Sequence, residues 1–164
     1  GHSKLKAEEV IAKSGAKAAI IRTVLVFGVV ADMSRSNIVL WVKSSLEQGK
    51  PISVVDDQFR SPTLAEDLAD GVIAVLFRGK TGVYHISGPE IMSVYDIAVR
   101  VADFFELDRS LISRTDSATL NQAAKRPPKT GFIILKAQTE LDYNPCDFES
   151  ALQIVDKQLK AAKS

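Results

Sequence analysis

The feature that most constrains the fold is an apolar stretch that does not alternate with polar residues. Residues 18–26 read AAIIRTVLV, which is apolar at almost every position. A strand with two apolar faces is typical of a parallel sheet that helices cover on both sides. This stretch therefore predicts a strand buried on both faces.

Shorter strand patterns alternate with helical patterns along the rest of the chain. Strands are predicted at residues 52–55, 82–87 and 111–114, and helical spacing starts at residues 8, 38, 63, 93 and 147. Capping signals support three of these helices: Thr63 with Glu66, Ser93 with Asp96, and Asp147. The alternation favours an α/β fold with parallel strands and flanking helices.

Composition excludes several classes of protein. The chain of 164 residues is long enough for one domain, and 21 basic against 20 acidic residues leave no excess charge for nucleic acid. The longest apolar run is short and contains Arg22, so no membrane span is predicted. One cysteine and two histidines cannot build a structural zinc site, so no metal is predicted. The single cysteine fits a reducing compartment, and we expect a cytoplasmic protein.

One expected signal of such folds is missing. Many α/β domains open with a strand and a G-x-G-x-x-G turn that holds a dinucleotide, but no such motif occurs here. The chain opens on a helical pattern instead. The sequence therefore predicts either a domain that binds no dinucleotide or the later part of a larger protein. Residues 115–131 form one long irregular stretch, and such loops are often functional.

Several segments, in order, resemble the C-terminal half of the extended short-chain dehydrogenase/reductase family, nearest the dTDP-4-dehydrorhamnose reductase type. The segments that carry the resemblance are 3–8 (SKLKAE), 21–28 (IRTVLVFG), 54–58 (VVDDQ), 61–63 (SPT), 67–69 (DLA), 82–88 (GVYHISG) and 124–127 (AKRP). They span nearly the whole chain.

The resemblance implies a Rossmann-like architecture from which the N-terminal dinucleotide-binding half is absent. Residues 1–164 would then form a single substrate-binding domain. The parent protein would use NADP or NAD to transfer hydride to a 4-keto sugar nucleotide. The isolated fragment is expected to bind no dinucleotide and to be inactive.

Lys4 matches the lysine of the family's Tyr-x-x-x-Lys signature. Residues four apart share a helix face, so the ammonium can lower the pKa of the tyrosine phenol, which then acts as a general acid. The tyrosine would stand one position before Gly1, although residues 1–3 also match an expression scar. The alternative interpretation of Lys4 is a solvated helix lysine.

The strand after Arg22 would end beside the nicotinamide in this family. The resemblance implies that Thr23 and Val26 line the cofactor. Leu25 stands where rhamnose-type reductases carry a tryptophan against the sugar and where epimerases carry an asparagine. This departure leaves the sugar open, and a packed strand leucine is the alternative.

The resemblance also implies a nucleotide pocket. Asn37 and Ile38 open a helix whose free N–H groups suit phosphate, although Asn37 is equally a helix cap. Val54 would line the base pocket, or else belong to the core of the domain.

Arg60 and Arg126 match positions whose arginines contact the substrate diphosphate. Guanidinium groups present a planar fork of donors that suits phosphate oxygens. The two residues are therefore predicted to clamp a nucleoside diphosphate sugar; two solvated loop arginines are the alternative. Rhamnose-type reductases usually lack an arginine at the Arg60 position.

Three functions stay open at this stage. The first is the substrate-binding portion of a sugar-nucleotide reductase, whose parent is predicted to form a homodimer. The second is a nucleotide-sugar epimerase or dehydratase, which Leu25 and Arg60 keep open. The third is a non-catalytic binding or regulatory member of the same family.

Overall fold

A computed structural model describes residues 1–30, 37–119 and 127–162. The helices are α1 His2–Lys13, α2 Ile38–Glu47, α3 Ala65–Phe77, α4 Val94–Phe104, α5 Leu135–Leu141 and α6 Phe148–Ala161, with a 3-10 turn at Arg109–Leu111. The strands are β1 Ala19–Arg22, β2 Val26–Phe27, β3 Ile52–Val55, β4 Phe59–Arg60, β5 Thr63–Leu64, β6 Gly82–His85, β7 Met92–Ser93, β8 Ile112–Thr115 and β9 Lys129–Thr130. The α/β class with parallel strands is confirmed.

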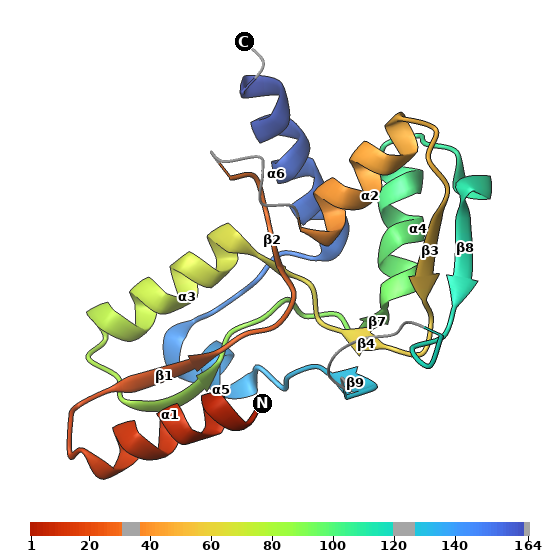
Figure 1. The fold of residues 1–164 in the computed structure, drawn as a ribbon. Coiled ribbons are helices and arrows are strands. Elements are labelled where there is room, and N and C mark those ends of the chain that lie inside the picture. Colours follow the sequence, from red (N-terminus) through yellow and green to blue (C-terminus); the bar gives the residue numbers. More distant parts are fainter. Residues whose placement is uncertain (31–36, 120–126, 163–164) are drawn as a thin grey trace.

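Parallel pairing dominates the sheets. The pairs β1–β6, β2–β5 and β3–β8 are parallel, and β4 pairs in parallel with β9 and antiparallel with β7. Figure 1 shows β1 and β6 beside α1, α3 and α5, whereas β3 and β8 lie against α4 and α2.

Two apolar clusters support these groups. The larger one joins α2, α4 and α6 to β3 and includes Val39, Val42, Ile97, Val101, Leu152 and Val155, all 0% exposed. The smaller one joins α3, β6 and α5 through Val75, Tyr84 and Leu141. The helical periods predicted from the sequence therefore face the core at α2, α4 and α6.

The predicted strand over residues 18–26 is wrong in two respects. It is split into β1 and β2, because Leu25 adopts a left-handed backbone with φ 47°. All four residues of β1 are half-buried, so the strand is not buried on both faces.

Two of the three capping predictions are confirmed. Ser93 and Asp96 form a reciprocal capping box at α4, and the side chain of Asp147 accepts from the Ser150 amide at α6. The capping box predicted for Thr63 and Glu66 is wrong. Helix α3 begins after Leu64 without a side-chain cap, because the Thr63 hydroxyl is used in a contact far away in the sequence.

Candidate functional site

The candidate site lies at the carboxyl ends of β1 and β6. Ligands of open parallel sheets bind at this end of the strands. The chain leaves β1 at Thr23, and the Ile86 amide still donates to the Arg22 carbonyl at 3.0 Å. The segment from Thr23 to Leu25 therefore follows the sheet edge before the chain turns at the positive φ of Leu25.

Thr63 holds this segment in place through hydrogen bonds. Its hydroxyl donates to the Val24 carbonyl at 2.8 Å, and its amide donates to the Leu25 carbonyl at 3.2 Å. The Gly88 amide donates back to the Thr63 hydroxyl at 3.3 Å. Thr63 is fully buried, so three segments distant in the sequence meet at one side chain.

Gly88 packs so closely here that no side chain fits. A Cβ atom at this position would lie 2.0 Å from the Pro62 carbonyl oxygen, which is backbone and cannot rotate away. The junction of β5 with the end of β6 therefore requires glycine at residue 88.

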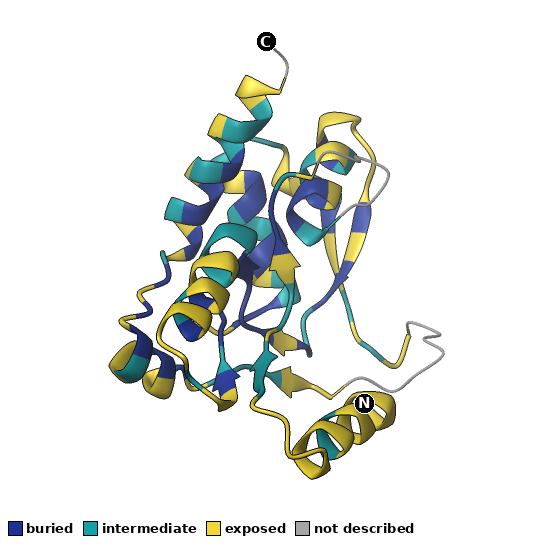
Figure 2. Ribbon diagram, turned by 90° about the vertical axis from the view of Figure 1, so that its left-hand side faces the viewer, coloured by how far each residue is buried: buried dark blue, intermediate teal, exposed yellow. Residues whose placement is uncertain are grey.

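The residues predicted to meet a cofactor are exposed. Thr23 and Lys4 are exposed, and Val26 in β2 is 38% exposed. Helix α1, which carries Lys4, contributes no buried residue (Figure 2). The sequence contains no G-x-G-x-x-G turn, the usual cradle for a dinucleotide pyrophosphate.

Helix α1 reaches the sheet through an ion pair. The Glu8 carboxylate accepts from Arg22 Nε at 3.0 Å and from Arg22 Nη2 at 2.5 Å. The hydrogen bond from Arg22 lowers the pKa of Glu8, and the hydrogen bond to Glu8 raises the pKa of Arg22. Both groups are therefore charged at neutral pH.

The predicted substrate residues Leu25, Ile38 and Val54 belong to the larger apolar cluster or pack against it, whereas Asn37 caps a helix. Leu25 and Ile38 are half-buried against the larger apolar cluster. Val54 is 3% exposed and its side chain belongs to that cluster. Asn37 caps α2, because its Oδ1 accepts from the Leu40 amide at 3.2 Å and its Nδ2 donates to the Gly28 carbonyl at 2.8 Å.

Arg60 is not a solvated loop arginine. It is 6% exposed, and its Nη1 donates to the carbonyls of Phe59 and Pro128 at 2.7 and 3.1 Å. Its Nη2 donates to Gln58 Oε1 at 2.7 Å. Arg126, the second arginine of the predicted clamp, lies outside the described residues.

The buried polar cluster around Arg60, which includes Gln58 and Ser61, was not predicted from the sequence. Gln58 and Ser61 are 4% and 0% exposed, and Gln58 Nε2 and Ser61 Oγ have no hydrogen-bond partner among the residues that the structure describes. Gln58 lies just before β4, outside the strands predicted from the sequence, so no local signal pointed to its burial.

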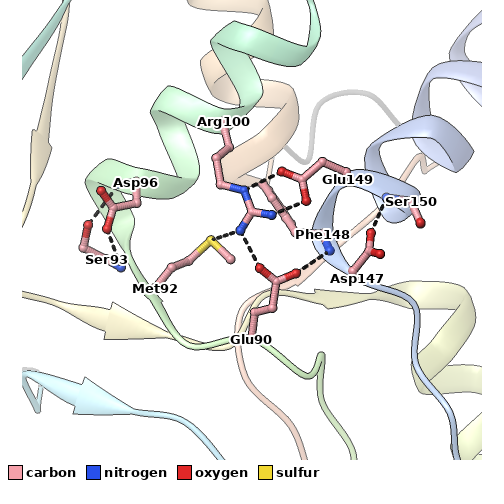
Figure 3. A network of polar contacts seen from close by, with 9 residues as sticks. All are labelled: Glu90, Met92, Ser93, Asp96, Arg100, Asp147, Phe148, Glu149 and Ser150. Atoms are coloured by element: carbon pink, nitrogen blue, oxygen red, sulfur yellow. Dashed lines mark hydrogen bonds and ion pairs between the residues drawn. The ribbon is translucent and has the colours of Figure 1, made fainter.

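A second polar network joins α4, α6 and the loop before β7 (Figure 3). Arg100 donates to Glu90 at 2.5 Å and through Nε to Glu149 at 2.6 Å, and Glu90 accepts from the Phe148 amide at 2.9 Å. Burial lowers the pKa of Arg100, but its bonds to the two carboxylates outweigh burial and raise it. The network connects structural elements and does not reach the end of β1.

Cys146 is held as a neutral thiol. Burial raises its pKa to about 12, and its Sγ donates to Asp67 at 3.1 Å. Burial also raises the pKa of Asp67. A thiol with this pKa is a poor nucleophile at neutral pH, so the geometry assigns Cys146 to packing.

Neither metal binding nor membrane insertion has support in the parts of the chain described. Residues 1–30, 37–119 and 127–162 hold no group of three or more His, Cys, Asp or Glu side chains placed around a metal ion. None of the helices within these ranges has the length and apolarity needed to cross a bilayer.

Comparison with known proteins gives one family. The family model described as RmlD substrate binding domain matches residues 1–161. The spore coat polysaccharide biosynthesis protein SpsK of Bacillus subtilis (strain 168) is 31% identical over 155 residues, covering 93% of this chain and 52% of that protein. The dTDP-4-dehydrorhamnose reductase of Aggregatibacter actinomycetemcomitans is 28% identical over 167 residues, covering 93% of this chain and 54% of that protein.

Solved structures agree on the fold. The dTDP-4-dehydrorhamnose reductase of Bacillus anthracis str. Ames, solved in complex with NADP, superposes with a TM-score of 0.86 at 22% identity. The match covers 96% of this chain and 54% of that one. The chain thus spans about half the length of the relatives that it matches.

A relative of a different kind is the methionine adenosyltransferase 2 subunit beta of Xenopus laevis. It is 30% identical over 115 residues, which cover 67% of this chain and 34% of that protein.

Proposed function

Because the chain belongs to the RmlD substrate binding domain family, we propose that it is the substrate-binding half of an NAD(P)-dependent sugar-nucleotide reductase. The observation that carries the proposal is the match to residues 1–161 together with a coverage of about half of SpsK and of the Aggregatibacter reductase. In this proposal residues 1–164 form one substrate-binding domain, and a dinucleotide-binding half precedes it in the longer protein.

An incomplete apolar surface supports this division. Within the described ranges β1 pairs with β6 alone, so its other edge is open. In addition, β1 and α3 border a hollow of about 470 Å³ lined in part by Ile21, Val72 and Leu76. Leu76 and Phe77 are 74% and 83% exposed. An apolar face of this kind is typical of an interface between domains.

Each site residue has a defined part in the proposal. Lys4 stabilises the phenolate of the family's tyrosine, four positions earlier in the longer protein, which donates a proton to the substrate oxygen. Thr23 and Val26 line the nicotinamide at the carboxyl end of β1. Bound NADPH or NADH supplies the hydride.

We assign the nucleoside diphosphate to the surface between β4 and the start of α2. Arg126 contacts the phosphates, and Arg60 supports it by holding the Pro128 carbonyl two residues further along. Leu25 faces the sugar, and Asn37 and Ile38 border the nucleotide, whereas the side chain of Val54 belongs to the core. Burial of Arg60 favours support of this kind over the paired clamp expected from sequence, because its described bonds go to protein oxygens.

Titration with dTDP and UDP tests this assignment. We expect NMR shifts with a dissociation constant of about 1 mM, or roughly −4 kcal/mol, because half of the pocket is missing. Arg126→Ala should abolish the shifts, and Lys129→Ala, which removes an exposed cation nearby, should leave them in place. Equal shifts in both variants, or equal shifts with thymidine, would contradict the assignment.

Activity assays test whether turnover requires both the substrate-binding half and the dinucleotide-binding half. The chain alone, with NADPH and a dTDP-4-keto sugar, should turn over nothing above the blank. The longer protein should reduce the same substrate, and Lys4→Met in it should abolish turnover. Turnover by the isolated chain would contradict the proposal. The homodimer and the cytoplasmic location stay predictions.

A non-catalytic role is the second candidate, and one relative favours it. The methionine adenosyltransferase 2 subunit beta is named as a subunit of another enzyme, and it covers 67% of this chain. If the longer protein has this role, Lys4→Met leaves its function unchanged. Product analysis distinguishes an epimerase or dehydratase on the same scaffold, since only a reductase consumes NADPH stoichiometrically.

A further inference from the structure

Helix α1 has little attachment to the rest of the domain. None of its residues is buried, and none belongs to either apolar cluster. Within the described part of the chain, its side-chain hydrogen bonds to other elements are the two from Arg22 to Glu8. The other side-chain ion pair of the helix, Lys6 with Glu9, is internal to α1.

The Glu8–Arg22 pair lies at the carboxyl end of β1. Arg22 is the last residue of β1, at the end of the strand where the candidate site lies. Its partner across the sheet is His85, whose charge also lowers the pKa of Glu8. The Glu8 side chain is 24% exposed, so the carboxylate is partly shielded from water where it meets the guanidinium.

Because of the direction of α1, this contact fixes the position of the helix along β1. Figure 1 shows α1 and β1 side by side and running in opposite directions, so the start of α1 points past the end of β1. Lys4 precedes Glu8 by four residues, on the same face of the helix. At a rise of about 1.5 Å per residue, it lies roughly 6 Å further along the axis, beyond Arg22.

We propose that the Glu8–Arg22 ion pair is the positioning device for Lys4. It sets how far α1 slides along β1 and thereby holds the Lys4 ammonium beside the carboxyl end of the strand. The proposal rests on the proposed function for the catalytic part of Lys4, whereas the register itself belongs to this chain. Glu8 and Arg22 touch no reacting atom and act through the helix.

Hydrogen exchange on this chain tests the register. Glu8→Gln and Arg22→Gln should each lower the protection of α1 amides, by about fivefold for a partly exposed ion pair. Glu9→Gln is the matched control: it removes a carboxylate one position away that bonds only within the helix. The exchanged pair, Glu8→Arg with Arg22→Glu, should restore protection. Protection that is equal in Glu8→Gln, Glu9→Gln and the unmodified chain overturns the proposal.

Kinetics of the longer protein test the link to Lys4. Glu8→Gln should lower kcat with little change in KM, since the substrate pocket is untouched, and the exchanged pair should recover kcat. Altered protection with an unchanged kcat overturns the positioning role. If the unsubstituted longer protein has no turnover, the proposed function fails, and the exchange data still decide the register.

Discussion

The hydroxyl of Thr63 donates to the carbonyl of Val24 across 39 positions of sequence, at 2.8 Å. This hydrogen bond connects β5 to the segment that follows β1, which is part of the candidate site. The same hydroxyl accepts from the Gly88 amide at the end of β6. One small side chain thus holds together the two strand ends on which the site depends.

Replacing Thr63 by Val should destabilise the chain by about 1–3 kcal/mol, because a buried carbonyl and a buried amide lose their partner while the shape is kept. Urea unfolding followed by circular dichroism measures the change. Thr63→Ser keeps the hydroxyl and should cost less than Thr63→Val. Equal costs would mean that the methyl group contributes as much as the hydroxyl and would contradict the role of the hydrogen bonds.

Asn37→Ala should lower the free energy of unfolding by about 1 kcal/mol, the usual effect of losing an N-cap. Asn37→Asp keeps an acceptor for the Leu40 amide and should cost less. Both are measured by thermal unfolding, with dTDP titrated at a temperature where each variant is folded. A large loss of affinity with unchanged stability would instead assign Asn37 to the nucleotide.

Arg100→Met should destabilise the chain by about 1–3 kcal/mol, since Glu90 keeps a partly buried carboxylate without its cation. Arg109→Met is the control, because its pair with Asp103 is well exposed, and its loss should cost less than about 0.5 kcal/mol. Denaturant unfolding at pH 7 compares the two. A smaller cost at Arg100 than at Arg109 would contradict the role of the network.

The Arg100 effect should also depend on pH. Burial raises the pKa of Glu90, but the hydrogen bonds from Arg100 and the Phe148 amide, together with the charge of Arg100, outweigh burial, and the pKa lies below its ordinary value of 4.5. A carboxyl whose pKa is lowered on folding stabilises the fold above its ordinary pKa, and this stabilisation is lost as pH falls through the lowered value. Unfolding of Arg100→Met and the unmodified chain should therefore converge in acid.

The pKa of Asp67 should lie above the ordinary aspartate value, and the pKa of Asp147 should lie below it. Burial raises the pKa of Asp67, and the hydrogen bond from the Ser150 amide lowers that of Asp147. Carboxyl carbon NMR shifts recorded against pH should show Asp67 losing its proton at the higher pH. For stability the signs differ too: Asp67 is most favourable below its ordinary pKa, and Asp147 above its own. The reverse order of titration would exclude these environments.

Local signals in the sequence predicted the elements that depend on local contacts. The Ser93–Asp96 box and the Asp147 cap are confirmed because both partners lie within one helical turn. Thr63 carries the same local signal, yet its hydroxyl serves a contact 39 positions away, which no helix pattern reveals. Tertiary contacts therefore override a capping motif where a better partner lies elsewhere in the fold.

The residue types of the candidate site could be predicted from the sequence, but the backbone conformation and burial of those residues could not. The family resemblance placed Leu25 and Arg60 near a substrate, but the positive φ of Leu25 and the burial of Arg60 depend on the packed structure. Gln58, which accepts a hydrogen bond from Arg60, is an uncharged residue outside the predicted strands. Such pairs become visible only when β4 is placed between β7 and β9.

The parallel pairing of β3 with β8 bears on how the chain folds. Ser53 and Ser113 face one another across this pair, 60 positions apart, and β1 likewise pairs with the distant β6. A strand pair of this kind forms only after a long loop has closed, which slows folding relative to hairpins and helical bundles. During synthesis β1 has to wait for residue 82 before its ladder can begin, so the apolar residues 18–26 emerge from the ribosome long before the strand that protects them.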